Sequence, residues 1–294
     1  MGIVNVTPDS FSDGGLFLEA PAAIEHGLAL LEAGADIVDV GGESTRPGAE
    51  PVSGDEELRR VLPVVEGISA ARTGRQISID TCKAPVAAAA LEAGASLVND
   101  VSALRADPEM AGLIAERGVE CCLMHMLGEP RTMQRDPRYA DVVGEVKSFL
   151  EERLEFAVRE GIGEGRVLLD PGIGFGKSVE HNLELLRRLD ELAALGPPIL
   201  VGTSRKSFLG RIAARSRRAR SGGSGQPPCA GQACALDPTD LPGVQERLGG
   251  TVASNVMAYE RGARVFRVHD VAPVRQALAV AAATLGADGR PGAR

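Results

Sequence analysis

The sequence predicts an α/β protein of one domain, folded as a (β/α)8 barrel. Eight short apolar runs alternate with segments of helical periodicity along the 294 residues, and this alternation is typical of parallel strands joined by helices. The length also suits a barrel, which usually takes roughly 250 residues. An open, doubly wound sheet is the alternative fold, and the count of eight strand–helix units favours the barrel.

The expected strands are short and apolar, and most run into a polar or glycine-rich loop. They cover residues 2–6, 37–40, 77–80, 97–100, 119–125, 167–170, 199–202 and 264–269. Helices are expected over about 21–33, 84–93 and 139–159, and again after Ser178 and Lys206. A further helix follows from the apolar stripe of Leu58, Val61, Leu62 and Val65, which recur at helical spacing.

The segment 167–177 is the clearest strand–helix unit. Three apolar residues lead to Asp170, and a glycine-rich loop follows. Ligands of parallel α/β proteins bind at the carboxyl ends of the strands, so Asp170 is a candidate substrate ligand. The alternative is that its carboxylate only caps the glycines of the loop.

Composition narrows the possible partners and compartment. A net charge of −8 argues against a general nucleic-acid surface, so an anionic substrate would need a local cationic pocket. The sequence holds no uncharged apolar run of about 18 residues, the length that would predict a membrane span. Its start lacks the charged segment of a secretory signal. Five scattered cysteines predict a protein of the reducing cytoplasm.

Residues 211–243 are expected to be a flexible insertion within a domain that covers 1–285. Five arginines between 211 and 220 precede a stretch rich in glycine, serine and proline, which supplies little for a core. Cys229 and Cys234 lie there, but a zinc site needs about four closely spaced ligands. The arginines are interpreted as a solvated helix end rather than a nucleic-acid contact. Residues 286–294 are expected to form a disordered tail.

The predicted barrel brings polar residues from many strand ends to one rim, where they form two chemical sets. The first offers acceptors and donors for a flat hydrogen-bonding heterocycle: Asp80, Asn99, Asp170 and Lys206. The second offers donors and positive charge for phosphate: Asn5, Thr45, Arg46, Arg267 and His269. The alternative is a rim that is merely polar and solvated.

Six segments in fixed order carry a resemblance to a known family. They are residues 5–15, 41–48, 123–126, 170–177, 204–207 and 267–270. With them the sequence resembles the dihydropteroate synthases, folate-pathway transferases of the pterin-binding TIM-barrel family, from Gly2 to about Val280. The resemblance implies that p-aminobenzoate displaces diphosphate from 6-hydroxymethyl-7,8-dihydropterin diphosphate to give 7,8-dihydropteroate.

The resemblance also implies roles for individual residues. The positions that match pterin ligands are Asp80, Asn99, Met124, Asp170, Gly202 and Lys206. Those that match diphosphate ligands are Asn5, Thr45, Arg267, Val268 and His269, with Asn5 also the ligand of a Mg²⁺ cofactor. The p-aminobenzoate positions are Arg46, Pro47, Phe175 and Ser207. Catalytic roles are implied for Asp80, Asp170, Lys206 and Arg267. A homodimer is also implied, and two loops, at 7–19 and 42–54, that close over the site.

These roles suit a dissociative, carbocation-like path, because the arginine and the metal would stabilise the leaving diphosphate and the carboxylates the cationic pterin. Two other functions stay open. One is a methyltetrahydrofolate:corrinoid methyltransferase of the same barrel family, which would not need Arg267, His269 and Ser207 together. The other is a pterin-binding paralogue without catalysis.

Overall fold

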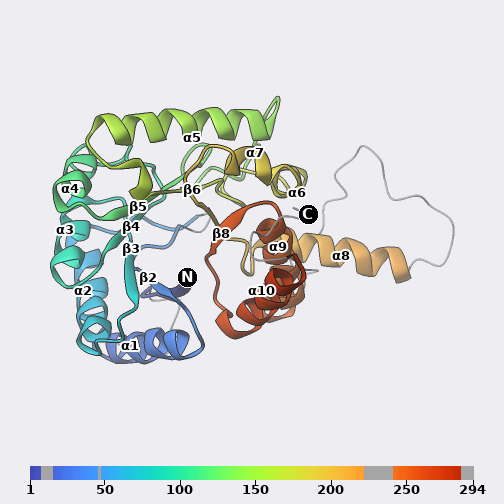
Figure 1. The fold of residues 1–294 in the computed structure, drawn as a ribbon. Helices are drawn as coiled ribbons and strands as arrows, with labels where there is room; N and C mark the ends of the chain where they lie inside the picture. Colours follow the sequence, from blue (N-terminus) through green and yellow to red (C-terminus); the bar gives the residue numbers. More distant parts are fainter. Residues whose placement is uncertain (8–15, 46–47, 222–240, 286–294) are drawn as a thin grey trace.

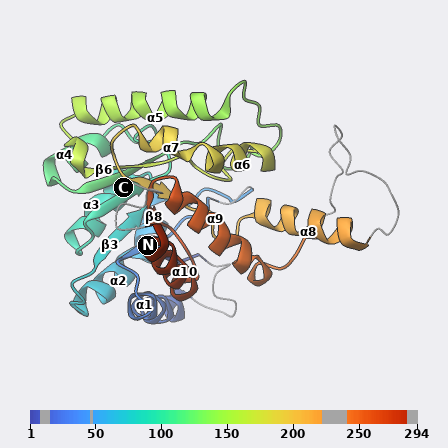
Figure 2. The ribbon, with the colours of Figure 1, turned by 45° about the vertical axis from the view of Figure 1, so that its right-hand side comes forward.

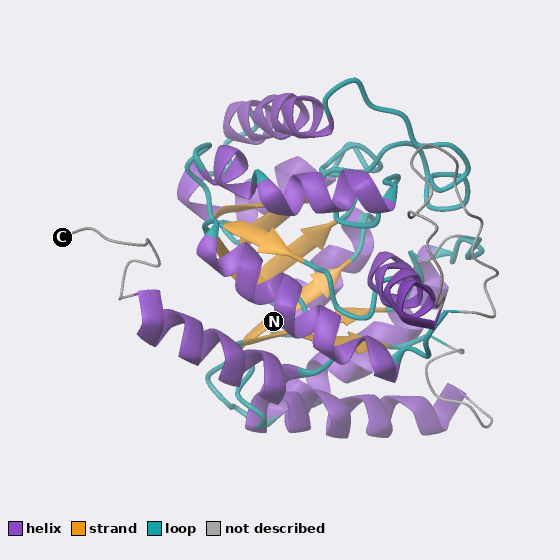
Figure 3. Ribbon diagram, turned by 90° about the vertical axis from the view of Figure 1, so that its right-hand side faces the viewer, coloured by secondary structure: helices purple, strands orange, loops and turns teal. Residues whose placement is uncertain are grey.

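The computed structural model describes residues 1–7, 16–45, 48–221 and 241–285. Its strands lie at the centre, and the helices surround them on the outer side (Figures 1 and 3). Among the described residues, no helix combines the length and the apolar character needed to cross a membrane. The described part of the chain thus forms a single α/β domain.

One sheet holds all the strands in the order of the sequence, and each neighbouring pair is parallel. The strands are β1 (Gly2–Asn5), β2 (Ile37–Gly41), β3 (Gln76–Asp80), β4 (Leu97–Asp100), β5 (Glu120–Met124), β6 (Val167–Asp170), β7 (Ile199–Val201) and β8 (Ala263–Phe266). The eight predicted strands are therefore confirmed, with ends that differ by at most three residues.

The two edges of the curled sheet approach each other just beyond β8. Gly2 and Val268 form one isolated parallel bridge. The backbone N–H of Ile3 donates to the carbonyl of Val268 at 3.1 Å, and the N–H of Val268 donates to the carbonyl of Met1 at 2.9 Å. The structure is thus an eight-stranded parallel sheet whose first and last strands approach each other at a single isolated bridge among the described residues.

Helices connect successive strands. They are α1 (Leu16–Glu32), α2 (Gly54–Ala70), α3 (Ala84–Glu92), α4 (Met110–Arg117), α5 (Val142–Arg159), α6 (Val179–Arg187), α7 (Leu189–Ala193), α8 (Ser207–Ser221), α9 (Leu248–Glu260) and α10 (Val271–Leu285), with the short 3₁₀ helices η1 (Glu164–Arg166) and η3 (Gln245–Arg247). The α6 helix begins where it does because Ser178 and His181 form a reciprocal capping box.

The first part of the predicted insertion lies within a helix. Residues 211–221 continue helix α8, which projects away from the strands (Figures 1 and 2). Arginine is a good helix former, so a polar arginine-rich run can extend a helix without supplying core residues. The rest of the predicted insertion up to residue 240, with Cys229 and Cys234, and the predicted tail 286–294 lie outside the described residues.

Alternation along the strands separates two cores. The outer face of the sheet packs against the helices through residues such as Val40, Ile79 and Leu169. The inner face carries a smaller apolar layer of Leu97, Cys122, Leu168 and Leu200. Because residues two apart on a strand share a face, the next inward position on each of these strands lies one step nearer the carboxyl ends.

Candidate active site

The carboxyl ends of the strands carry the predicted pterin residues. Asp80, Met124 and Asp170 are the last residues of β3, β5 and β6, Asn99 is the third residue of β4, and Gly202 directly follows β7. Asn99, Met124 and Asp170 are buried, and Asp80 is half-buried. The sheet therefore places these side chains at the same end of neighbouring strands, as the sequence predicts.

An ion cluster joins three strands at this rim. The Nε of Arg267 donates to Oδ2 of Asp39 at 2.5 Å, and its Nη2 donates to Oδ2 of Asp80 at 2.7 Å. The Nδ2 of Asn99 donates to the same Asp39 oxygen at 3.1 Å. A residue predicted for diphosphate, Arg267, thus contacts one predicted for the pterin ring, Asp80.

Burial and neighbouring charges set the protonation of this cluster. Burial raises the pKa of Asp80 to about 7; Arg267 opposes the shift, and the nearby carboxylates of Asp39, Glu57 and Asp100 add to it. Burial also opposes the charge of Arg267, but Asp39 and Asp80 outweigh it and raise its pKa above the usual value. Asp80 can therefore change charge near neutral pH while Arg267 stays cationic.

Asp170 is held by the glycine-rich loop that follows it. Its Oδ1 accepts a hydrogen bond from the backbone N–H of Gly172 at 2.7 Å. Gly172 has a φ of 65°, and a Cβ there would lie 1.8 Å from the carbonyl oxygen of His125, so only glycine fits. Burial raises the pKa of Asp170, while the charge of Lys206 opposes that shift. Both readings of Asp170, loop cap and ligand, thus remain compatible with its position.

Lys206 reaches back over the same loop. Its Nζ donates to the carbonyl of Ile173 and lies 4.5 Å from the centroid of the Phe175 ring. Burial lowers the pKa of Lys206 to about 8, and the charge of Asp170 partly opposes that shift. The structure therefore brings together three predicted residues: Asp170 at the end of β6, Phe175 in the loop after β6 and Lys206 in the loop after β7.

The remaining predicted residues lie at or just beyond the ends of β1, β2, β7 and β8. Val268 is buried, and the Nδ1 of His269 lies 3.0 Å from Oγ of Ser204. Ser207 is exposed at the first turn of α8, where backbone N–H groups lack helical partners. Asn5, at the end of β1, and Thr45, in the loop after β2, are both half-buried. Arg46 and Pro47 lie outside the described residues.

The sequence analysis missed two buried groups that support the rim. In the sequence, Asp39 stands within a run that predicts an apolar strand. A carboxylate within such a run is nevertheless a signal that it meets a cation. Lys177, which is 3% exposed, contacts Nδ1 of His125 at 2.9 Å and the carbonyl of Phe175 at 3.0 Å. Burial lowers the pKa of Lys177 well below its usual value, and burial together with Lys177 lowers that of His125 to about 2.

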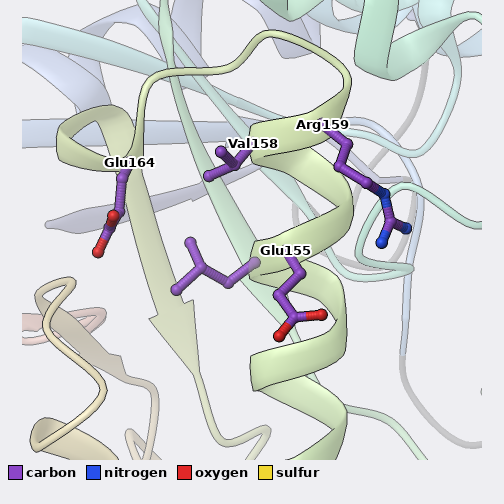
Figure 4. Close-up of a pocket in the computed structure, with 5 residues that line it drawn as sticks. Glu155, Val158, Arg159 and Glu164 are labelled. Carbon is purple, nitrogen blue, oxygen red and sulfur yellow. The ribbon is translucent and has the colours of Figure 1, made fainter.

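Two surface hollows lie away from these residues. One is lined by Leu154, Glu155, Val158, Arg159 and Glu164 on α5 and η1, at the amino end of β6 (Figure 4). The other lies at the starts of α5 and α6 and includes Tyr139, Asp141, His181 and Arg188. Neither includes a residue predicted for the substrates, so the convergence of side chains at the strand ends identifies the candidate site.

The predicted Mg²⁺ site depends on an oxygen ligand at the end of β1. The described residues include no cluster of three or more His, Cys, Asp or Glu side chains that could hold a metal ion. Mg²⁺ commonly takes one or two protein oxygens and completes its shell with water and phosphate. The half-buried amide of Asn5 at a strand end is a donor of that kind, so the residues present fit Mg²⁺ held jointly with a diphosphate.

Comparison with known proteins adds independent evidence. The family described as "Pterin binding enzyme" matches residues 1–269. A dihydropteroate synthase from Escherichia coli strain K12 is 44% identical over 98% of this chain and 92% of its own. One from Synechocystis is 42% identical over 96% of this chain and 88% of its own.

Solved structures give the same result. A Xanthomonas albilineans dihydropteroate synthase with 4-aminobenzoic acid has a TM-score of 0.83 and 44% identity, covering 97% of this chain and 92% of that one. A structure of the enzyme from the same organism, with 7,8-dihydropteroate, has a TM-score of 0.80 and 42% identity at the same coverage. The chain therefore belongs to the pterin-binding enzyme family, among the dihydropteroate synthases.

Proposed function

We propose that the protein is a dihydropteroate synthase. The amine nitrogen of p-aminobenzoate bonds to the methylene carbon of 6-hydroxymethyl-7,8-dihydropterin diphosphate, the C–O bond to diphosphate breaks, and the amine loses a proton. The observation that carries the proposal is the meeting of Asp80, Asn99 and Arg267 with Asp170 and Lys206 at one end of the sheet. Relatives crystallised with 4-aminobenzoic acid and with 7,8-dihydropteroate support it.

The ring half of the site matches a flat heterocycle that carries N–H and amino donors. Buried carboxylates are costly unless donors meet them, and Asp80 and Asp170 would receive such donors from the ring. Asn99 and Lys206 would add a side-chain amide and a cation. When diphosphate departs, positive charge grows on the pterin, and the two carboxylates stabilise it by their position rather than by bonding.

The diphosphate half of the site is cationic. Arg267 stays charged and carries several N–H donors, which suits an oxygen-rich leaving group. His269, Val268 and Thr45 would complete the contacts on that side. Mg²⁺ held by Asn5 and the diphosphate would neutralise charge that grows on the leaving oxygens.

The second substrate would lie beyond the Asp170 loop. Phe175 offers a ring face, and Ser207 lies where backbone N–H groups at the start of α8 point outward, which suits the carboxylate of p-aminobenzoate. Arg46 and Pro47 are proposed to border the same substrate. The amine of p-aminobenzoate is a weak nucleophile, so a dissociative path and positioning of the two reactants would carry much of the rate.

Four further features, which concern the architecture, assembly and location of the protein, belong to the same proposal. We propose that the sheet closes as a barrel, supported by the bridge between Gly2 and Val268. The single domain is proposed to span residues 1–285, with an insertion at about 211–243 that begins within α8. A homodimer is proposed on the family resemblance, and a cytoplasmic location on the scattered cysteines.

One assay tests the proposed function against both alternatives. Purified protein is mixed with Mg²⁺, the pterin diphosphate and p-aminobenzoate, and released diphosphate and dihydropteroate are measured. A synthase releases both only when both substrates are present. A methyltetrahydrofolate methyltransferase or a non-catalytic pterin-binding protein would release neither, and that result would overturn the proposal.

A further inference from the structure

Asp39 lies at the centre of the ion cluster but has no assigned role. It is the third residue of β2, and its side chain is fully buried. One oxygen, Oδ2, accepts from both Arg267 and Asn99. The other, Oδ1, is buried without a hydrogen-bond partner among the described residues. A carboxylate kept in this half-satisfied state is costly, which calls for an explanation beyond stability.

The bond to Arg267 fixes which edge of the guanidinium remains for a ligand. Arginine carries five N–H donors in one plane. The described bonds of Arg267 use Nε toward Asp39 and Nη2 toward Asp80. Because Nε donates to a buried residue of β2, the position of β2 sets the plane of the guanidinium group. The Nη hydrogens are then the ones that can reach an anion. Asp39 therefore orients the arginine independently of Asp80.

The bond to Asn99 fixes a second orientation. The amide nitrogen of Asn99 donates to Asp39 at 3.1 Å, so its Oδ1 is directed elsewhere. An asparagine presents either an acceptor or a donor, depending on which end of its amide is held. A carboxylate accepts only from the nitrogen, so Asp39 makes Asn99 an acceptor toward a ring N–H.

We propose that Asp39 is a positioning residue that holds Arg267 through Nε and orients the amide of Asn99, and that it keeps both in place when Asp80 exchanges Arg267 for the pterin ring. This inference rests on the proposed function of the site. A purely structural role, in which Asp39 only neutralises a buried arginine, is the competing explanation, and the two differ in what a variant changes.

Charge gives the first distinguishing readout. The charged groups that act on Asp80 are Arg267 beyond β8, Asp39 on β2, Glu57 on α2 and Asp100 on β4. Burial is the main reason that the pKa of Asp80 is raised, and Asp39 contributes to the rise. Removing the charge of Asp39 should therefore lower the pKa of Asp80. The acidic limb of the pH profile of kcat/KM should then lie below its wild-type position near pH 7.

The main experiment compares Asp39→Asn with Asp36→Asn. Asp36 lies just before β2, is 74% exposed and pairs with Arg75 at 2.7 Å, so it is a matched carboxylate–arginine pair outside the site. We expect Asp39→Asn to lower kcat/KM for the pterin diphosphate about tenfold or more, with KM for p-aminobenzoate within about threefold. Asp36→Asn should match the wild type. If Asp39→Asn has the same kcat/KM as the wild type and the same acidic limb of the pH profile, the proposal is overturned.

A double-mutant cycle tests whether Asp39 acts through Arg267. If it does, Asp39→Asn should lower kcat/KM by a smaller factor in the Arg267→Ala background than in the wild type, because only the contribution through Asn99 remains. Losses that multiply in full would show that Asp39 does not act through Arg267 and would contradict the inference. Thermal unfolding of each variant separates this result from a general loss of fold.

A measurement on the wild type keeps the inference testable if Asp39→Asn does not fold. The Nε–H resonance of Arg267, assigned by its absence in Arg267→Lys, should be protected from exchange both without and with bound pterin diphosphate. Rapid exchange in the complex would overturn the proposal. If the wild type instead releases no diphosphate, the proposed function fails, while protection in the free protein still reports on the Asp39 contact.

Discussion

Two layers on the inner face of the sheet differ sharply although the same strands build both. The lower layer is apolar and consists of Leu97, Cys122, Leu168 and Leu200. Two residues further along each strand lie the positions proposed for the pterin: Asn99, Met124, Asp170 and Gly202. One step of strand periodicity therefore separates the packing positions from the positions proposed for binding in this protein.

The comparison predicts separate consequences for the two layers. Substitutions that change the shape of the lower layer should lower the free energy of unfolding, since its side chains are buried among apolar neighbours. The upper layer carries the polar side chains of Asn99 and Asp170, which are proposed to bind the pterin, so substitutions of these two residues should affect substrate binding more than stability.

The largest effect is expected from Asp170→Asn and Lys206→Ala. Each removes a group proposed to hold the pterin ring and to balance its charge, so kcat should fall by at least about 100-fold. The matched control is Asp190→Asn, an exposed carboxylate on α7. Steady-state kinetics with thermal unfolding checks both points. Near-normal turnover in either purified variant would count against the role given to the upper layer.

Arg267→Ala should have the next largest effect, and it should be selective. Loss of the cation proposed for diphosphate should raise KM for the pterin diphosphate by about 10- to 100-fold, because charge-assisted hydrogen bonds are lost. The KM for p-aminobenzoate should change little. Equal changes in both constants would contradict the division of the rim into ring and diphosphate halves.

The pH dependence should show a smaller effect. Asp80 has a pKa of about 7 and Lys206 one of about 8, so affinity for the pterin should rise as pH increases through 7 and fall above 8. The rise should vanish in Asp80→Asn and the fall in Lys206→Arg. Titration of pterin binding between pH 5.5 and about 9.5 tests this, and a flat wild-type profile would contradict it.

The raised pKa of Asp80 also has a consequence for stability. Between its ordinary value of 3.8 and about 7, the folded protein binds more protons than the unfolded chain. The contribution of this group to stability is therefore present below that window and is lost as pH rises through it. Denaturant unfolding of wild type and Asp80→Asn at several pH values measures the difference.

Leu97→Ala should affect substrates least among the inner-face variants. Leu97 is fully buried in the lower layer, so truncation should cost roughly 2–5 kcal/mol in the free energy of unfolding. KM values should stay within about threefold where the variant is folded. Unchanged stability with a large change in KM would reverse the roles assigned to the two layers.

Deleting residues 222–240 should have the smallest effect on activity. These residues follow α8, which starts near the rim at Ser207 and runs outward to Ser221 (Figure 2). The kcat/KM for both substrates should remain within about twofold of the wild type. Loss of substrate binding on deletion would place that segment at the site.

The sequence predicts most of this fold because local signals suffice for it. Apolar runs locate all eight strands, and Asp80 and Asp170 are the strand-final residues that the pattern predicts. The end of α8 could not be placed, because composition distinguishes polar from apolar residues but not a solvated helix from a loop. The contact between the two edges at Gly2 and Val268 joins residues far apart in the sequence, which no local pattern encodes.

The contacts within the site are harder to predict. Asp39 and Arg267 are separated by 228 positions, and only folding reveals that they share a hydrogen bond. Likewise, Lys177 looks like the ordinary end of a glycine-rich loop until its contact with His125 is seen. Sequence supplied the residue types at the rim, while the pairing among them, and hence the shift of the Asp80 pKa, required the three-dimensional arrangement.

A crystal structure of the protein with the pterin diphosphate and Mg²⁺ would show directly whether the pterin ring binds at the ends of the strands. We expect the ring to lie within hydrogen-bonding distance of Asp80, Asn99 and Asp170, with the diphosphate on Arg267. A ring bound elsewhere, for instance in the hollow beside α5, with the upper layer left empty, would contradict it.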